Sequence, residues 1–440
     1  MEGTEPKQGT RAPYLHSLAA PLPLTFPPGW QLSTLADFPA SDEHVDAALL
    51  AREALKRPHD CPPLDKLLRP SHTVCILIED LTRTSPKHII LGEVLSILSG
   101  LGMPDEHITI LIALGTHRPL TDRELRQTFG EATVERYRFV NHDCHGEDLV
   151  PIATLPGGTP VLINGLAYRA DFRLGIGSIF PHPLNGFGGG GKILFPGIAD
   201  ARSIFEHHLR HAFRDRSALG SLDGNDFRDE IERLASAGRL DFIVNSVLDN
   251  GDRLRHVVAG TPAAAHLAGT TLCRQLTSRL FYGKAEVTVI SAFPYDQGPQ
   301  IMKPLAPASM ITAKGGTIIL YADCRSPLPE TYLDACVRFR SEHGGALRQA
   351  VFASFAAGRP ILADAPPELN MSMAQTMLAL NDFTVILVCP GMPATDIGRL
   401  GFLPAASMGE AIDLAAARHP TATVNVVPAG GVILPVLTCQ

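Results

Sequence analysis

The sequence contains no long apolar run and no block of basic residues. Its longest apolar runs, such as 108–114 and 385–389, are far shorter than the roughly 20 residues that cross a bilayer. Its first residues also lack the basic and apolar regions of a secretory signal. Lys and Arg number 38 against 45 Asp and Glu, a formal net charge of −7. We therefore expect a cytoplasmic protein that binds no membrane and no nucleic acid.

Closely spaced cysteines are also absent. The eight cysteines are scattered along the chain, and no two of them form a C-x-x-C pair. This excludes a disulfide framework and a zinc ribbon, so we expect reduced thiols. Hydrophobic residues make up 45% of the 440 residues, which is enough for sizeable cores and excludes intrinsic disorder. A chain of this length typically forms two or three domains.

Strand-like and helix-like patterns alternate from residue 72 onward. Residues 72–80 and 107–115 are short apolar runs typical of buried strands, and residues 87–101 are apolar at helical spacing. Thr121 and Glu124 form the S/T-x-x-E pattern of a helix start. Strands that are apolar on both faces and alternate with helices predict an α/β fold with a mostly parallel sheet.

The alternation divides into two α/β domains. The first covers residues 1–283 and begins with a proline-rich lead-in arm over residues 1–65. The second covers residues 284–440 and starts with the strand pattern KAEVTVISAF. The further predicted elements are hairpins at 148–165 and around Asn250-Gly251, strands at 171–179, 315–323 and 383–391, and helices at 201–213, 226–237, 262–277, 330–341, 346–357 and 408–418.

Two polar motifs directly follow buried strands, where open α/β sheets place their ligand groups. Asp80, Thr82 and Arg83 supply a carboxylate, a hydroxyl and a guanidinium that suit a ribose and a phosphate. Taken alone, this motif is explained more simply as a capping turn. His117 stands in Gly-Thr-His-Arg after the next strand and suits acid–base chemistry. Its alternative is a loop histidine bonded to backbone.

A glycine-rich loop lies between a predicted strand and a predicted helix. Gly186 and Gly188–Gly191 remove side chains, so that backbone N–H groups can approach an anion closely. Lys192 then supplies a positive charge or a nucleophilic amine. Because Ile193 follows the lysine, the loop is not a Walker A motif, which needs a hydroxyl there for Mg²⁺. The alternative is a flexible linker, which the apolar flanks disfavour.

Histidines cluster in one predicted helix. His207 and His211, or His208 and His211, share a face and could hold a metal jointly. The alternative is an ordinary polar helix face. A second histidine cluster, at 141–145, is a weaker metal candidate, and we expect it to be structural.

Taken together and in order, these motifs resemble the nickel-dependent lactate racemase family. The set consists of DLTR, GTHR, PHxxxGFxGGxKxxxPG and a histidine sixteen residues past the lysine. The resemblance is strong from His72 to His208. It extends to Gln300 and Lys303, which are similar to a Q-x-x-K pair that family members place over the active site. Several motifs in the same order are more specific than any one of them.

The resemblance implies a two-domain α/β protein with its active site in the cleft between the domains. It also implies a nickel-pincer nucleotide, a pyridinium mononucleotide that binds nickel through two sulfur atoms and a ring carbon. The roles carried over by position are acid–base groups His117 and His182, nickel ligand His208, cofactor contacts Lys192, Asp80, Thr82, Arg83, Gly188, Gly189, Gly190 and Gly191, and substrate contacts Arg83, Gln300 and Lys303. Lys192 matches the lysine that can form a thioamide link to the cofactor.

The glycine loop departs from the family pattern at two positions. Family members often have Ala-Gly-(Tyr/Phe)-Ser-Gly-Gly, whereas this chain has Asn185 at the alanine position and Gly188 at the serine position. The first change places an amide where a methyl is usual, and the second removes a hydroxyl donor to the cofactor.

The resemblance implies a racemase or epimerase that inverts C2 of a small 2-hydroxy acid. The C2 hydride moves to and from the cofactor while one histidine takes the hydroxyl proton and another returns it. Two histidines are needed because the two enantiomers present their hydroxyls in opposite directions. The expected partners are this substrate and the host's cofactor-biosynthesis proteins, and a homo-oligomer is left open.

Three other functions remain open at this stage. One is 2-epimerisation of a larger sugar acid by the same chemistry, with Asn185 meeting additional hydroxyls. Another is a regulatory protein that binds a nucleotide without catalysis. The third is a metal hydrolase built on the histidine helix.

Overall fold

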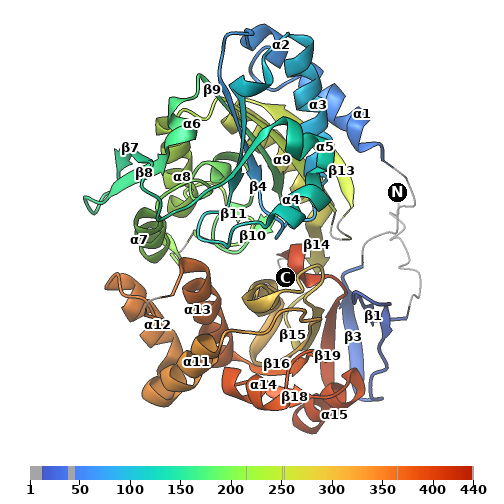
Figure 1. Cartoon of the computed structure of the whole chain (residues 1–440). Coiled ribbons are helices and arrows are strands. Elements are labelled where there is room, and N and C mark those ends of the chain that lie inside the picture. Colours follow the sequence, from blue (N-terminus) through green and yellow to red (C-terminus); the bar gives the residue numbers. More distant parts are fainter. Residues whose placement is uncertain are drawn as a thin grey trace.

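The computed structural model describes residues 12–37, 45–214, 216–249, 251, 253–363 and 365–438. Figure 1 shows two lobes, each built around a six-stranded sheet. This confirms the predicted α/β fold with mostly parallel sheets. None of the described helices is both long enough and apolar enough to span a membrane.

The first lobe has the strand order β13-β12-β9-β4-β5-β6. All neighbours are parallel except β12 and β13. The strands are β4 (Val74–Glu79), β5 (Ile108–Ala113), β6 (Arg138–Asn141), β9 (Phe172–Ile179), β12 (Phe242–Leu248) and β13 (Leu254–Gly260). Its central strand β9 is buried at every position, as expected for a strand covered on both faces.

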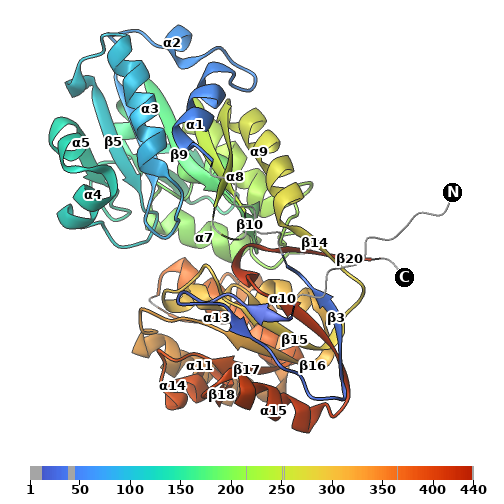
Figure 2. The same ribbon diagram turned by 90° about the vertical axis from the view of Figure 1, so that its right-hand side faces the viewer.

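Helices cover both faces of this sheet (Figure 2). One face packs on α1 and α3 and the other on η2, α8 and α9. The helices of this lobe are α1 (Ala47–Lys56), α2 (Leu64–Leu67), α3 (Lys87–Gly100), α4 (Asp122–Phe129), α5 (Glu131–Arg136), α6 (Gly165–Arg169), α7 (Ala201–His211), α8 (Asp226–Ala237) and α9 (Pro262–Thr277), with the 3₁₀ turns η1 (Asp105–His107) and η2 (Gly190–Ile193). The predicted capping box at the start of α4 is confirmed.

Small two-stranded pairs complete the first lobe. The predicted hairpin at 148–165 is confirmed as β7 (Leu149–Thr154) and β8 (Pro160–Asn164). A second pair, β10 (Pro181–His182) and β11 (Gly186–Phe187), opens the glycine-rich loop.

The second lobe has the strand order β18-β17-β16-β15-β19-β3, entirely parallel. Its strands are β15 (Ala285–Ser291), β16 (Thr312–Tyr321), β17 (Thr384–Val388), β18 (Leu403–Ala405), β19 (Ala422–Val427) and β3 (Trp30–Leu35). Its helices are α10 (Leu305–Ile311), α11 (Glu330–His343), α12 (Leu347–Ala356), α13 (Pro367–Asp382), α14 (Ala394–Leu400) and α15 (Met408–Arg418), with the 3₁₀ turns η3 (Gly298–Met302), η4 (Gly344–Ala346) and η5 (Gly430–Val432).

The predicted lead-in arm covers residues 1–65, of which residues 1–11 and 38–44 lie outside the described residues. Its described parts belong to both lobes. β3 pairs with β19 and extends the second sheet, and the short pair β1 (Tyr14–Leu15) and β2 (Leu22–Pro23) lies beside it. α1 instead packs on the first lobe. A parallel strand needs a distant partner, so no local pattern in the first 65 residues could reveal this pairing.

The chain passes from the first sheet to the second between β13 and β15. β14 (Ser278–Phe281) lies in this passage and pairs with β20 (Leu434–Leu437) near the C-terminus. Both views place this pair at the junction of the lobes (Figures 1 and 2). The predicted boundary at Gly283 falls within the same passage.

Candidate active site

The polar motifs of the first lobe come together because they follow three adjacent parallel strands. The order β9-β4-β5 places the carboxyl ends of these strands at one edge of the sheet. Asp80 follows β4, His117 lies in the loop after β5, and His182 is in β10 directly after β9.

Asp80 and His117 form a hydrogen-bonded pair at this edge. The Nδ1–H group of His117 donates to Oδ2 of Asp80 at 2.5 Å. The other carboxylate oxygen, Oδ1, accepts from the backbone N–H of Thr82 at 3.0 Å and from its hydroxyl at 2.5 Å. The hydrogen bonds between Asp80 and Thr82 form the capping turn that was the structural alternative for this motif. The same turn orients the Asp80 carboxylate toward His117. Nε2 of His117 is left as the nitrogen that can exchange a proton.

The pKa values of this pair move in opposite directions. Burial acts to raise the pKa of Asp80, but the hydrogen bond and charge of His117 outweigh it and hold that pKa well below its usual range. Burial also acts to lower the pKa of His117, and the hydrogen bond and charge of Asp80 raise it overall. The carboxylate thus orients the ring and stabilises its charged form.

Buried groups hold the Asp80–Arg83 turn in place. The ammonium of Lys87, only 2% exposed, donates to the backbone carbonyls of Asp80 and Arg83, the latter at 2.7 Å. The guanidinium of Arg83 lies over the ring of Phe180, 4.5 Å from its centre. The charge of Arg83 is therefore presented from a fixed position.

His182 and Lys192 meet on the other side of the site. Nε2 of His182 lies 3.2 Å from Nζ of Lys192. Nδ1 of the same ring accepts the backbone N–H groups of Leu184 at 3.2 Å and Asn185 at 3.1 Å. A nitrogen that accepts two N–H groups carries no hydrogen itself, so the neutral ring keeps its proton on Nε2.

Both groups are shifted toward their neutral forms. Burial, and then the charge of Lys192, holds the pKa of His182 well below its ordinary value. Burial, followed by the charges of Arg83 and Arg228, lowers the pKa of Lys192 to about 7. An amine with such a pKa is largely available as a nucleophile near neutral pH.

The glycine-rich loop is packed tightly against the protein. A Cβ on Gly188 would lie 2.6 Å from the ring of Phe180, and one on Gly190 would lie 2.5 Å from the guanidinium of Arg228. Gly189 and Gly190 have positive φ angles of 75° and 61°. These glycines therefore allow close packing and a left-handed backbone. Their predicted contact with a cofactor stays a prediction.

Asn185 is held within the glycine-rich loop. Its side chain is fully buried, and its amide Nδ2 donates to the carbonyl of Phe187 at 2.6 Å within the same loop. Its Oδ1 is buried and has no hydrogen-bond partner among the described residues, so its expected contact with additional substrate hydroxyls stays a prediction.

The histidines of α7 have different surroundings. His208 donates from Nδ1 to the carbonyl of Ile204 at 2.8 Å, which leaves the lone pair on Nε2. Burial, opposed by that backbone hydrogen bond, lowers the pKa of His208 to about 4, so its ring is neutral. His207 is fully buried and donates from Nε2 to the carbonyl of Phe227 at 3.1 Å. Nδ1 of His207 is buried and has no hydrogen-bond partner in the part of the chain that the structure describes, whereas His208 is only partly buried. His208 as the nickel ligand stays a prediction, which its more accessible side chain favours.

The second lobe supplies a cation. Lys303 follows η3, and its Nζ lies 4.5 Å above the ring centre of Tyr295. Burial, and then the charges of Arg83 and Lys192, holds the pKa of Lys303 well below its ordinary value, and Asp80 opposes this. Lys303 of the second lobe therefore lies near enough to the charged groups of the first lobe for their charges to shift its pKa. Gln300, in η3 itself, has a buried Oε1 without a hydrogen-bond partner.

α13 holds this part of the second lobe. Gln375 donates to the carbonyl of Lys303 at 3.0 Å, and Ser372 donates to the carbonyl of Pro299 at 3.2 Å. Glu368, in the first turn of the same helix, accepts a hydrogen bond from the hydroxyl of Thr116 at 2.7 Å. Glu368 is a site residue that the sequence analysis missed, and the Pro-Pro-Glu helix start was the signal available for it.

The predicted structural role of the 141–145 cluster agrees with the contacts of His142. Its Nε2 donates to the carbonyl of Ala199 at 2.9 Å, and Nδ1 accepts from the amide of Asn164 at 3.3 Å. Among the residues that the structure describes, no group of three or more His, Cys, Asp or Glu side chains is placed to hold a metal ion.

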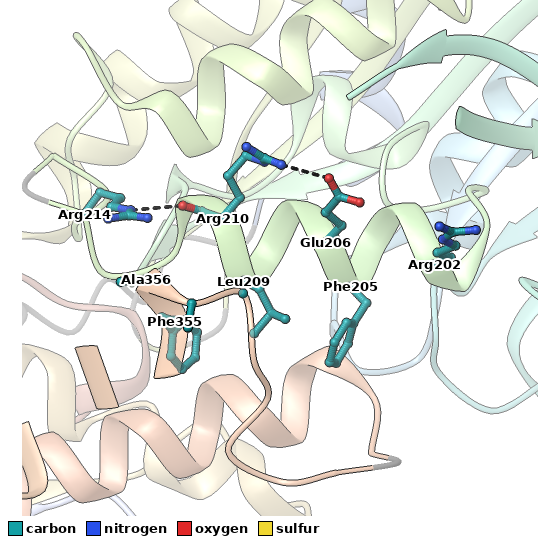
Figure 3. A pocket seen from close by; sticks show the side chains of 10 residues that line it. Arg202, Phe205, Glu206, Leu209, Arg210, Arg214, Phe355 and Ala356 are labelled. Atoms are coloured by element: carbon teal, nitrogen blue, oxygen red, sulfur yellow. Dashed lines mark hydrogen bonds and ion pairs between the residues drawn. The ribbon is translucent and has the colours of Figure 1, made fainter. Parts of the chain in front are cut away.

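A cavity of about 510 Å³ lies between α7 of the first lobe and residues 355–358 of the second lobe (Figure 3). α7 contributes Arg202, Glu206 and Arg210, and Phe355 comes from the second lobe. Arg210 pairs with Glu206 at 2.9 Å. The described lining residues include none of the predicted catalytic groups, so this cavity is separate from the candidate site.

Comparison with known proteins gives a consistent set of relatives. Residues 20–220 match the lactate racemase N-terminal domain. Lactate racemases of Lactiplantibacillus plantarum and Thermoanaerobacterium thermosaccharolyticum are 33% identical over 277 residues and 31% identical over 280 residues. Each alignment covers 62% of this chain and 65% of the relative, so it spans slightly less than two thirds of the relatives' length.

Solved structures resemble the chain over nearly its whole length. The lactate racemase apoprotein of T. thermosaccharolyticum has a TM-score of 0.85 at 25% identity, covering 97% of this chain and 100% of that one. A Thermotoga maritima protein has a TM-score of 0.66 at 20% identity, covering 89% of this chain and 98% of that one. The second likeness concerns the fold alone.

Proposed function

We propose, for a chain whose residues 20–220 match the lactate racemase N-terminal domain, that the protein is an isomerase that inverts C2 of a small 2-hydroxy acid. The observation that supports this most is the arrangement of two histidines around a cation-rich site. His117 is bonded to Asp80, and His182 is bonded to Lys192.

The residues present fit a nickel-pincer nucleotide. His208 offers a neutral imidazole with a free lone pair, which is a suitable nickel ligand. Lys192 offers an amine of lowered pKa for a covalent link, and Arg83 offers a fixed positive charge to a phosphate. When bound, this group supplies an acceptor for the C2 hydride.

The positive charges of the site bind the substrate's carboxylate. Arg83 and Lys303 face the site from opposite lobes, and Asp80 is the carboxylate coupled to both. Because Asp80 is already engaged by His117 and Thr82, an anion would gain most from the remaining cations. Substrate held from both lobes would also be shielded from water.

His117 then moves the hydroxyl proton. Asp80 keeps a proton on Nδ1, so Nε2 is the atom that accepts the proton from the substrate hydroxyl. Removal of that proton allows C2 to lose its hydrogen with the bonding electrons and become a planar keto acid. This avoids forming a carbanion next to a carboxylate, which is a high-energy dianion.

His182 serves the opposite face of the planar keto acid. Its proton on Nε2 points toward Lys192, so it first acts as a hydrogen-bond donor. To give its Nε2 proton to the substrate oxygen, the ring must first gain a proton on Nδ1, since it would otherwise be left as an imidazolate. In the reverse direction, the neutral ring must carry its hydrogen on Nδ1 so that Nε2 can accept a proton. That requires the N–H groups of Leu184 and Asn185 to turn away from Nδ1.

The test is to load the protein with the nickel cofactor and follow one pure enantiomer of lactate by polarimetry. The expected result is loss of optical rotation, with deuterium at C2 retained. Each of His117→Ala and His182→Ala should slow both directions, by about 10²–10⁴-fold. Near-wild-type racemisation in either variant, or deuterium washout into solvent, would contradict the proposal. A panel of malate and an aldonate defines the substrate side chain.

A further inference from the structure

The loop that carries His117 is contacted by a carboxylate from the other lobe. The hydroxyl of Thr116 donates to Oε2 of Glu368 at 2.7 Å. Thr116 lies in the first lobe after β5, and Glu368 lies in the first turn of α13 in the second lobe. The hydrogen bond therefore joins the two lobes at the residue adjacent to the acid–base histidine.

The backbone that carries Glu368 is itself fixed. Asn370, fully buried in the next part of the same turn, accepts the N–H of Leu362 at 2.9 Å and donates to its carbonyl at 3.0 Å. Its Nδ2 also reaches the carbonyl of Ala365 at 3.3 Å. The buried amide of Asn370 thus ties Leu362 and Ala365 to the first turn of α13. These hydrogen bonds fix the backbone position of Glu368 in that turn.

The charge of Glu368 also acts on His117. The groups that influence this imidazole are Asp80 on Nδ1, Glu368 from α13 and Arg83 from the neighbouring turn. The two carboxylates favour the charged ring, whereas Arg83 and burial disfavour it. One of these carboxylates belongs to the same lobe as His117 and stays with it. The other depends on how the second lobe is placed.

We propose that Glu368 is a positioning residue for the acid–base reaction. Through Thr116 it ties the second lobe to the loop of His117 and brings a second carboxylate to that imidazole. The site is thereby complete only when α13 is seated on the first lobe. The same helix holds the backbone of Lys303 through Gln375. Packing of α13 on the first lobe would therefore position both Lys303 and the carboxylate of Glu368 at the site.

The importance of this contact for turnover rests on the proposed function, but the contact and its electrostatic effect do not. The test therefore begins with the cofactor-free protein, in which the imidazole of His117 is titrated by NMR with labelled histidine. The spectrum of His117→Gln assigns its signal. Glu368→Gln is nearly isosteric and keeps an oxygen that accepts from Thr116, while it removes the charge.

Glu368→Gln should lower the pKa of His117 by about 0.5 unit or more. Thr116→Val keeps the charge but removes the donor, so it should lower that pKa by a smaller amount. Asp382→Asn is the matched control, because it removes one negative charge from the other end of α13, where Asp382 pairs with Arg348. It should leave the pKa of His117 unchanged. Thermal unfolding checks that all variants are folded.

Two results would overturn the proposal. One is a Glu368→Gln variant whose His117 titrates as in Asp382→Asn. The other is a Thr116→Val variant that lowers the pKa more than Glu368→Gln does. In the cofactor-loaded protein, the acidic limb of the kcat profile should move to lower pH in Glu368→Gln. If the NMR shift is found but the loaded wild-type protein racemises nothing, the inter-lobe contact stands and the proposed function fails.

Discussion

Lys192 and His182 share one hydrogen bond, with 3.2 Å between Nζ and Nε2. With a neutral imidazole, only one placement of the hydrogen atoms allows this bond to form. Backbone N–H groups occupy Nδ1 of the ring, so Nε2 carries the proton and donates it. Its acceptor must be a lone pair on the amine, which exists only when Lys192 is uncharged. The geometry and the lowered pKa of Lys192 therefore lead to the same neutral amine.

The first prediction concerns the reactivity of Lys192. Because burial and neighbouring charges lower its pKa to about 7, its amine should react with a small acylating reagent with a midpoint near pH 7. An ordinary lysine has a pKa of about 10.4. Pulsed labelling of the cofactor-free protein, followed by peptide mass spectrometry, measures the modified fraction against pH. The exposed Lys284 in the same sample is the internal control for reagent quality.

A variant separates the role of His182 from simple burial. His182→Phe keeps the volume of a ring and removes the Nε2 donor. The labelling midpoint of Lys192 should move to higher pH, because the Nε2–H donor that stabilises the uncharged amine is lost. A wild-type protein in which Lys192 is inert below pH 9 would contradict the neutral-amine assignment.

The second prediction concerns the pH dependence of stability. The pKa of Asp80 is lowered in the folded protein, so its contribution is present above the unfolded value of about 3.9 and is lost as the pH falls. The pKa of His117 is raised, so its contribution is present below about 6.5 and is lost as the pH rises through the folded value. The pair should therefore stabilise the fold most between about pH 4 and 6.5.

Urea unfolding of the wild type and of Asp80→Asn measures this window. The difference in free energy of unfolding should be largest near pH 5 and smaller at pH 8. Asp122→Asn is a suitable control, since Asp122 forms an exposed ion pair with Arg126 on the surface of the same lobe. A difference for Asp80→Asn that grows between pH 5 and 8 would show that the pair is not coupled as described.

Local patterns predicted the parts of the fold that depend on local chemistry. Residues 74–78 are all apolar and residues 108–114 are apolar except for one threonine, and β4 and β5 form there. The capping box at Thr121 is present, and the helix predicted at 262–277 is α9 with the same bounds. These elements combine strong periodicity with clear start signals, so little tertiary information is needed.

The elements that were missed depend on distant partners. β3 is a strand only because β19, almost 400 residues later, supplies its hydrogen bonds. α13 was not predicted either, and it carries Glu368, the missed site residue. The family motifs named groups of the first lobe and the Gln300–Lys303 pair of the second, but motif spacing gives no information on which residue of the second lobe contacts the loop of His117. That depends on how the two lobes pack.

The third prediction concerns the glycine-rich loop. Gly190 has a φ of 61°, and a Cβ there would meet both Arg228 and His266 at under 3.0 Å. Gly190→Ala should destabilise the protein by about 1–3 kcal/mol through backbone strain and overpacking. Gly92→Ala, in α3 where a Cβ meets nothing within 4 Å, should be neutral or stabilising by up to about 1 kcal/mol. Chemical unfolding of both variants measures the contrast. Equal effects would mean that the loop is not tightly packed.

The final prediction distinguishes the two metal-binding interpretations of α7. Helical spacing alone allows His211 to share a metal with His207 or His208, whereas the hydrogen bonds of the ring give His208 a free Nε2 and hold His207 against Phe227. In protein purified from a host that makes the nickel cofactor, His208→Ala should lower the nickel content per chain at least tenfold, because it removes the imidazole proposed to hold the metal. His211→Ala changes the same kind of side chain one turn further along the helix and should retain its nickel. Elemental analysis measures the metal, and circular dichroism checks that both variants keep their helix content. Loss of nickel from His211→Ala, with or without loss from His208→Ala, would restore the interpretation based on helical spacing, in which His211 shares the metal with one of its two neighbours.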